Sequence, residues 1–292
     1  MKIKDLLGKG RPSVSFEFFP PKTDAGIATL LETIAALKPL APTFVSMTYG
    51  AGGSTRARTV ELVSRIKNKI GLEAMAHLTC VGHTKNELSA ILTELRDEGI
   101  ENVLALRGDP PKGETRFVAH AGGFSHAADL VGFIRERFSF GVGVAGYPEK
   151  HPEAAALDVD MKHLREKVAR GADFVISQLF FSNADYFAFV ERLRVLGVSV
   201  PVIPGIMPVT DTEQVKRFTQ MCGARLPKEL LARLDLAGPD KAAVVRIGIE
   251  HATHQCEELL KRGAPGIHFY TLNKSEATRE VFLRLKSAGV VS

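Results

Sequence analysis

The sequence predicts an α/β protein of the (β/α)8 TIM-barrel class. Short segments rich in β-branched and aromatic residues alternate with segments of helical periodicity, which is typical of repeated βα units. Eight such units follow one another, and no Pro/Gly/Ser-rich linker divides the 292 residues. We therefore expect a closed parallel barrel in a single domain spanning residues 1–292. An open doubly wound sheet with an appended domain is the competing architecture.

Each predicted strand is followed by a segment that can form a helix, and several of these helices begin at a residue that can cap free N–H groups. The expected strands are residues 13–19, 43–49, 73–79, 102–108, 141–147, 173–181, 200–206 and 266–272. The expected helices begin near Asp24, Ser54 or Thr55, Thr84, Ser125, Leu157, Asn183, Thr210 and Ser275. Residues 222–266 leave room for extra helices before the last strand, and residues 110–124 read as a long loop.

Composition favours a soluble, cytoplasmic protein. No apolar run is long enough to cross a bilayer, and the N-terminus lacks the apolar stretch of a secretory signal. The three cysteines, Cys80, Cys222 and Cys256, are widely spaced, which argues against a disulfide framework or a structural zinc site. The net charge is +5, but lysines and arginines alternate with acids along the helices, so we expect no nucleic-acid partner.

One carboxylate, Glu17, lies in the otherwise apolar first strand. Alternation places Ser15, Glu17 and Phe19 on one face and Phe16 and Phe18 on the other, so Glu17 is expected to point into the barrel. A buried glutamate needs a partner or a use. Desolvation is expected to raise the pKa of Glu17, and an acid that stays protonated near neutral pH can serve as a general acid.

Polar or aromatic residues end most of the other strands, and these ends form the active face of a parallel barrel. Asp109 in "LRGDPP" is a second candidate carboxylate, although it could equally cap a turn. The loop "GYPEKHPEA" and the helix after it could hold an anion or a sugar, or could simply be solvated. The three glycines of "TYGAGGST", residues 48–55, could bring backbone N–H groups close to a ligand.

Several other motifs give a negative result. No G-x-G-x-x-G motif follows a predicted strand and no G-x-x-x-x-G-K-[ST] motif occurs, so a dinucleotide would have to bind without either. His251, His254 and Cys256 have a spacing that could be drawn as a metal site. They lack an acidic third ligand at helical spacing, so we expect no metal.

Eight segments together resemble the methylenetetrahydrofolate reductase family, and they span nearly the whole chain. In order they are "SFEFFPPK", "FVSMTYGAGGSTR", "HLTC", "LALRGDPP", "VAGYPEKHPEA", "ADFVISQLFF", "PVIPGIMP" and "IHFYTLN". The resemblance implies a barrel that binds FAD without a Rossmann motif and uses NADH or NADPH as hydride donor. It also implies small-molecule partners only, no membrane, and a homo-oligomer.

The implied reaction is ping-pong. Reduced nicotinamide passes hydride to FAD and leaves, and 5,10-methylenetetrahydrofolate then takes hydride from the flavin, giving 5-methyltetrahydrofolate for methionine synthesis. By resemblance, Glu17 is the general acid that protonates N10 of the folate, and Asp109 holds the pterin and acts electrostatically on the flavin. The implied substrate-binding residues are Asp109, Gln178, Gln214, Phe218 and Lys274, the last standing where arginine is usual.

The family pattern also places a set of residues around FAD, most of them at the strand ends noted above. They are Thr48, His77, Arg107, Gly108, Asp109, Ala127, Tyr147, His151, Asp160, His163 and Lys167. His126 departs from the tyrosine that many relatives carry, which affects one flavin contact. Two other functions remain open: a flavin-free barrel enzyme acting on a pterin, and a non-catalytic folate- or nucleotide-binding barrel.

Overall fold

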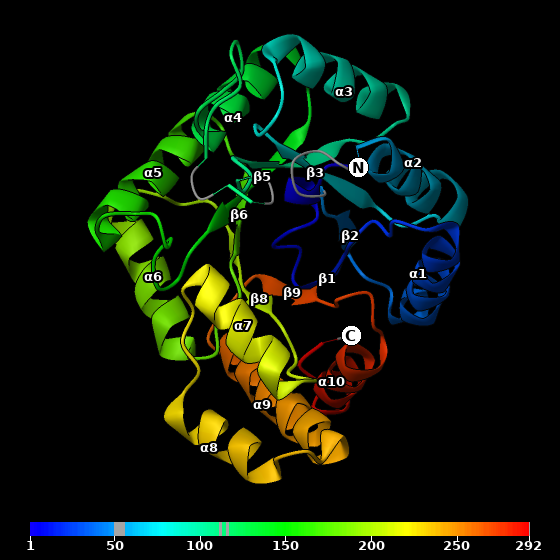
Figure 1. Cartoon of the computed structure of the whole chain (residues 1–292), viewed down its shortest axis with the longest axis vertical. Coiled ribbons are helices and arrows are strands. Elements are labelled where there is room, and N and C mark those ends of the chain that lie inside the picture. Colours follow the sequence, from blue (N-terminus) through cyan, green and yellow to red (C-terminus); the bar gives the residue numbers. More distant parts are fainter. Residues whose placement is uncertain (50–55, 111–112, 115–116, 292) are drawn as a thin grey trace.

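The computed structural model describes residues 1–49, 56–110, 113–114 and 117–291, and shows a ring of parallel strands enclosed by helices (Figure 1). The strand order is β7-β6-β5-β4-β3-β2-β1-β9-β8. The two outermost members of this order, β7 and β8, are separated in the chain by Pro204 alone, so the sheet closes on itself. The predicted (β/α)8 barrel is confirmed.

The bounds of the elements follow the predicted alternation. The strands are β1 Ser13–Phe18, β2 Phe44–Met47, β3 Ala74–Thr79, β4 Asn102–Leu106, β5 Gly141–Gly146, β6 Phe174–Ser177, β7 Val202–Ile203, β8 Gly205–Ile206 and β9 Gly266–Tyr270. The α-helices are α1 Asp24–Leu37, α2 Arg56–Arg65, α3 Lys85–Asp97, α4 Ala127–Arg137, α5 Leu157–Ala169, α6 Asn183–Val195, α7 Thr212–Cys222, α8 Lys228–Ala237, α9 Lys241–Lys261 and α10 Glu276–Ser287. Short helical turns cover Ile3–Asp5, Lys38–Leu40 and Ile66–Ile70.

The eight predicted helices begin within two residues of their predicted positions, because the residues that cap a helix lie next to its first turn in the sequence. Thr84 and Glu87 form a capping box, and the side chains of Thr23 and Asp211 accept hydrogen bonds from backbone N–H groups in the first turns of α1 and α7. The helix predicted near Thr210 is α7, and residues 222–266 add α8 and α9 before the last strand, with α8 packed on the outside of α9 (Figure 1). Among the described residues, no helix combines the length and apolar character needed to cross a membrane.

The seventh predicted strand, residues 200–206, is split in two by Pro204. Val202 and Ile203 pair with β6, whereas Gly205 and Ile206 pair with β9. Proline has no N–H to give to a ladder, and here its carbonyl accepts from the N–H of His268 at 2.9 Å. Gly205 must be glycine at this crossing, since a Cβ would lie 2.3 Å from the Ser177 carbonyl oxygen. The strand therefore changes partners at Pro204.

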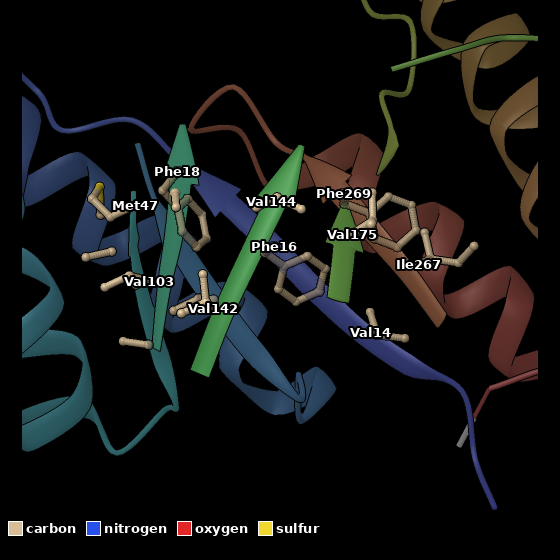
Figure 2. Close-up of a cluster of buried hydrophobic side chains, with 14 of the residues drawn as sticks. Val14, Phe16, Phe18, Met47, Val103, Val142, Val144, Val175, Ile267 and Phe269 are labelled. Carbon is tan, nitrogen blue, oxygen red and sulfur yellow. The ribbon is translucent and has the colours of Figure 1, made fainter. Parts of the chain in front are cut away.

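Strand β1 closes the barrel and presents two different faces. It pairs with β2 and with β9, the last strand of the chain. Phe16 and Phe18 are fully buried in a large cluster that includes strand residues and helix residues such as Leu30 and Ile34 (Figure 2). Ser15 and Glu17 lie on the opposite face, inside the barrel, as alternation predicts.

The barrel interior is apolar at one end and polar at the other. Its apolar layer contains Ile3, Phe44, Met75, Leu104, Phe174, Ile176 and Ile203. Gly143 of β5 makes room for Phe174, whose ring atoms would lie 2.6 Å from a Cβ at that position. The glycines of "GVGVAG" in β5, which match G-x-G-x-x-G, therefore serve close packing inside a strand. The polar layer lies toward the carboxyl ends of the strands.

Candidate active site

The polar layer is centred on Glu17 of β1, which is 6% exposed. Nε2 of His268 from β9 lies 3.3 Å from Oε2 of Glu17, and Nε2 of His77 from β3 lies 3.4 Å from the same oxygen. Both histidines point into the barrel because alternation in their strands places them there. The far nitrogen of the His268 ring, Nδ1, is 2.8 Å from the hydroxyl oxygen of Ser15. One buried carboxylate thus faces two buried imidazoles.

The electrostatics of this cluster correct one sequence-based expectation. Burial does raise the pKa of Glu17, but His77 and the hydrogen bond from His268 outweigh it, and the pKa lies below its usual value. The pKa of His77 falls to about 4, mainly because burial disfavours the imidazolium. The expectation that desolvation leaves Glu17 with a raised pKa is therefore wrong, since it considered burial without the two histidines.

Tyr270 joins this cluster to the next one. Its hydroxyl donates to the Ser177 carbonyl at 2.7 Å, and its ring packs edge-on against His268. Burial, with smaller contributions from Glu17 and Tyr147, raises the pKa of Tyr270 well above its usual range. Tyr270 therefore stays uncharged and lies between the Glu17 cluster and the residues that follow β5.

Arg107 follows β4 and is held in one orientation. Its two terminal nitrogens each donate to a carboxylate oxygen of Glu153 at 2.7 Å, and its guanidinium lies 4.9 Å from the centre of the Phe117 ring. Gly108 has a φ of +89°, and a Cβ there would lie 2.7 Å from Val81. The residue after Arg107 must therefore be glycine, and this turn leaves the next residue, Asp109, exposed.

A second row of polar side chains runs from β5 to α5. Tyr147 and His151 lie edge-to-face with ring centres 4.6 Å apart, and the carboxylate of Asp160 accepts from the backbone N–H of His151 at 2.8 Å. Lys167 donates from Nζ to the Ala145 carbonyl at 2.6 Å. Burial lowers the pKa of Lys167 to about 8, partly offset by Asp160. Burial also raises the pKa of Tyr147 to about 12. Direct contacts thus link Tyr147, His151 and Asp160, whereas Lys167 is hydrogen-bonded to β5, and a shared binding role for the four residues stays a prediction.

Gln178 and Phe218 border the site from the β6 and α7 side. The side-chain oxygen of Gln178 accepts from the backbone N–H of Leu179 at 2.8 Å, and its side chain also hydrogen-bonds Tyr147. Phe218 is partly buried in a separate apolar cluster that also includes Tyr270. Gln214 lies one helical turn before Phe218, in the first turn of α7, where its N–H donates to the Asp211 cap.

Other predicted site residues lie at the edge of this region or outside it. Thr48 follows β2 and is half-buried, and Ala127 begins α4. His163 is exposed on α5 and contacts the ring of His126, with ring centres 6.2 Å apart. Lys274 is exposed just beyond the turn that follows β9. The glycines of residues 50–53 lie outside the described residues.

Three buried polar atoms in the barrel mouth have no hydrogen-bond partner within the described part of the chain: Ser46 Oγ, His77 Nε2 and Thr79 Oγ1. Buried polar atoms normally have partners, so Ser46 Oγ and Thr79 Oγ1 are available to a polar ligand, whereas His77 Nε2 lies 3.4 Å from Glu17 Oε2. Arg107 and Lys167 supply two cations on the adjoining side, which suits a ligand with anionic groups. No group of three or more His, Cys, Asp or Glu side chains in the described ranges could hold a metal ion. His251, one of the histidines considered for a metal, contacts the Phe181 carbonyl at 3.1 Å.

Comparison with known proteins identifies the family. The family model described as "Methylenetetrahydrofolate reductase" matches residues 2–286. The chain belongs to the methylenetetrahydrofolate reductase family. The resemblance predicted from the eight sequence segments is thereby confirmed.

Relatives in the methylenetetrahydrofolate reductase family differ in length from this chain. It is 40% identical over 295 residues to "Methylenetetrahydrofolate reductase (NADH) 1" of Arabidopsis thaliana, covering 97% of this chain and 50% of that protein. It is 40% identical over 270 residues to "5,10-methylenetetrahydrofolate reductase" of Salmonella typhimurium, covering 92% and 88%. The chain thus spans about half the length of the plant relatives and most of the bacterial one.

A solved structure supports the barrel fold alone. An uncharacterized protein from Clostridium thermocellum that binds two copies of 5-methyl-5,6,7,8-tetrahydrofolic acid superposes with a TM-score of 0.61 at 14% identity, covering 95% of each chain. At this identity the likeness extends to the path of the chain and not to the site.

The structure adds two residues that the sequence reasoning missed. His268 was passed over, although alternation in "GIHFYTL" places it on the same face as Tyr270 and the pairing of β9 with β1 sets it opposite Ser15. Glu153 lies within the "GYPEKHPEA" loop but was not singled out, and no local signal shows that it pairs with Arg107, 46 residues away. Both matter because each fixes a predicted functional side chain.

Proposed function

We propose that this member of the methylenetetrahydrofolate reductase family binds FAD at the carboxyl ends of the barrel strands and reduces 5,10-methylenetetrahydrofolate with NADH or NADPH by a ping-pong reaction. The observation that carries the proposal is the buried Glu17 at the centre of a polar barrel mouth, in a chain 40% identical to a protein named as this reductase. The product, 5-methyltetrahydrofolate, would serve methionine synthesis.

The residues at this face suit FAD. Arg107 and Lys167 are the cations for its phosphates, and the glycine turn at Gly108 lets the backbone come close to a ligand. His77 of β3 and Thr48, which follows β2, continue the interior-facing alternation of neighbouring strands, from which they can contact the edge of a flat ring. The remaining predicted contacts, Asp109, Ala127, Tyr147, His151, Asp160 and His163, lie around the ends of β4 and β5 and on α4 and α5. When bound, the flavin would supply the hydride chemistry.

The protein's own contribution to the reduction is to bind, orient and protonate the substrate. Gln178 can hydrogen-bond the pterin, and Phe218 with Gln214 can border a flat ligand on the α7 side, where stacking suits folate and nicotinamide alike. Asp109 can hold the pterin from the β4 end, and Lys274 can attract an anionic tail. Glu17 is the general acid, giving a proton to N10 of the folate as the methylene bridge opens.

Glu17→Gln tests this function. The variant should keep bound FAD and its reduction by NADH, because neither needs the acid, and should lose the reduction of methylenetetrahydrofolate by about 10²- to 10⁴-fold. The measurement is the flavin spectrum under anaerobic conditions, first with NADH and then with the folate. NADH is the first donor to use, because the Arabidopsis relative is named as an NADH form. Glu32→Gln, an exposed glutamate on α1, is the matched control.

Two outcomes would contradict parts of the proposal. A protein that cannot be reconstituted with FAD would return the question to a flavin-free pterin enzyme or to a binding barrel without catalysis. Loss of flavin reduction in Glu17→Gln would contradict the assignment of Glu17 as the acid of the folate step. We further propose a cytoplasmic homo-oligomer, which fractionation and light scattering would test.

A further inference from the structure

We propose that His268 shares one transferable proton with Glu17 and supplies it to that carboxylate, so that His268 is the positioning residue of the acid step. This inference rests on the proposed role of Glu17. It also answers a question which that role raises. A carboxylate whose neighbours favour its ionised form needs a source for the proton that it gives away.

The ring of His268 is fixed on every side. The side chain is fully buried, Nδ1 lies 2.8 Å from Ser15 Oγ, and Nε2 lies 3.3 Å from Glu17 Oε2. The ring stacks on Phe44 with centres 5.9 Å apart and an interplanar angle of 17°, while Tyr270 packs against it edge-on. With the ring held in this way, Nε2 stays directed at Glu17.

The contacts of the Ser15 hydroxyl allow a proton on Nδ1 of His268. This hydroxyl lies 3.4 Å from the Ile267 carbonyl and 2.8 Å from Nδ1. In the proposed state it donates to the carbonyl and accepts from Nδ1–H of His268. With Nδ1 protonated, Nε2 carries either a lone pair or a second proton. A lone pair cannot bond a carboxylate, so the pair consists of a neutral imidazole with a carboxylic acid or of an imidazolium with a carboxylate. Both states contain one transferable proton.

The other groups around Glu17 do not take this role. His77 has a pKa of about 4 and is therefore neutral at pH 7, and its Nε2 has no hydrogen-bond partner within the described residues. Tyr270 stays neutral because burial raises its pKa well above its usual range. From β2, the side chains that share this interior are Ser46 and Phe44, which carry no charge. His268 remains as the partner that can hold the proton.

The transfer balances in protons and charge. Starting from imidazolium and carboxylate, the N–H bond at Nε2 breaks as the O–H bond at Glu17 Oε2 forms. Glu17 then passes this proton to N10 of the folate and is again a carboxylate, and His268 is left as a neutral imidazole. A proton from solvent restores the pair after product leaves. No electron is exchanged in this step.

The direct test is the protonation of His268 in the full-length chain labelled with ¹⁵N-histidine. Nuclear magnetic resonance distinguishes the two ring nitrogens, and the His268 signals are those that disappear in His268→Phe or His268→Gln. We expect Nδ1 to carry a proton at neutral pH and the signals of Nε2 to change in Glu17→Gln. A neutral ring with its proton on Nε2 and a lone pair on Nδ1 would overturn the proposal, because that proton could not be transferred. Assignment of the signals requires one folded His268 variant, and two substitutions are used for this reason.

The kinetic test separates a proton source from a packing role. His268→Phe keeps the ring stack on Phe44 but cannot hold a proton, and His254→Phe, on the exposed face of α9, is the control. A proton shared between His268 and Glu17 is retained to higher pH than a proton on Glu17 alone. The rate loss of His268→Phe in the folate half-reaction should therefore grow with pH and reach about tenfold or more at pH 9. Flavin reduction by NADH should be unchanged. A loss independent of pH would indicate packing alone and contradict the proposal.

The failure of this inference and the failure of the proposed function have different signatures. If Glu17→Gln keeps the folate half-reaction, Glu17 is not the acid and both ideas fail. If Glu17→Gln loses that half-reaction while His268→Phe matches the unsubstituted protein at every pH, the acid assignment stands and the role of His268 is refuted.

Discussion

Lys167→Met should stabilise the flavin-free protein by about 2 kcal/mol at pH 7 and weaken FAD binding. The residue as a whole is half-buried, but its Nζ is directed inward at the Ala145 carbonyl, 2.6 Å away. Methionine has a similar length and no charge, so it removes the cation without leaving a large cavity. If Lys167 binds an anionic group of FAD, its charge is expected to destabilise the protein as long as no anion is bound.

The magnitude follows from the pKa of Lys167. Burial lowers that pKa from its ordinary 10.5 to about 8, so holding the charge in the folded state costs about 3 kcal/mol, at about 1.4 kcal/mol per tenfold change. The cost is fully present below pH 8 and fades as pH rises from 8 to 10.5, where the unfolded chain also loses its proton. Methionine forgoes one hydrogen bond, worth about 1 kcal/mol, which leaves a net gain of about 2 kcal/mol at pH 7.

The assay is urea unfolding of the flavin-free protein between pH 7 and pH 10. Lys162→Met is the control, because Lys162 is exposed on the same helix and should change the unfolding free energy by less than about 0.5 kcal/mol. The advantage of Lys167→Met should shrink as pH rises above 8 and vanish near pH 10. A difference that stays constant across this range, or a variant less stable than the control at pH 7, would refute the reasoning.

Two further substitutions probe packing at Gly248 and the proposed phosphate-binding role of Arg107. Gly248→Ala should cost about 1–3 kcal/mol in thermal or urea unfolding, because a Cβ would lie 1.9 Å from the Val209 carbonyl oxygen. Gly132→Ala in α4 should be neutral or stabilising, because a Cβ there would make an ordinary contact with Arg170 at 3.6 Å. Equal costs at both sites would be inconsistent with this packing. Arg107→Lys loses the forked contact with Glu153 and should weaken FAD binding by about tenfold in a fluorescence titration, with an unchanged dissociation constant speaking against a phosphate-binding role.

The local features of this fold could be predicted from the sequence. The alternation of Ser15, Glu17 and the phenylalanines of β1 gives the correct interior face, and helix caps such as Thr84 give the correct helix starts. These signals depend only on residues a few positions apart. The alternation of strand-like and helix-like periodicity gives eight βα units, and eight such units predict a closed barrel.

What the sequence could not predict depends on distant partners. The break at Pro204 comes from a change of neighbouring strand, and neither neighbour is visible in "VPVIPGI". The predicted direction of the Glu17 pKa shift was wrong for the same reason, because His77 and His268, which lower that pKa, lie on other strands far along the chain. Likewise, the pairing of Glu153 with Arg107 has no signature in the spacing of either residue.

The closure of the barrel at β1 and β9 has a consequence for how the protein is made. The first strand is synthesised early, but the strand that covers its free edge emerges only after residue 266. Until then β1 has one unpaired edge, and Glu17 has no His268 beside it. A contact across most of the chain forms slowly, and exposed strand edges favour association between chains. We therefore expect a ribosome-bound chain stopped before β9 to lack a closed barrel. The contact between Glu17 and His268 can therefore form only after β9 has left the ribosome.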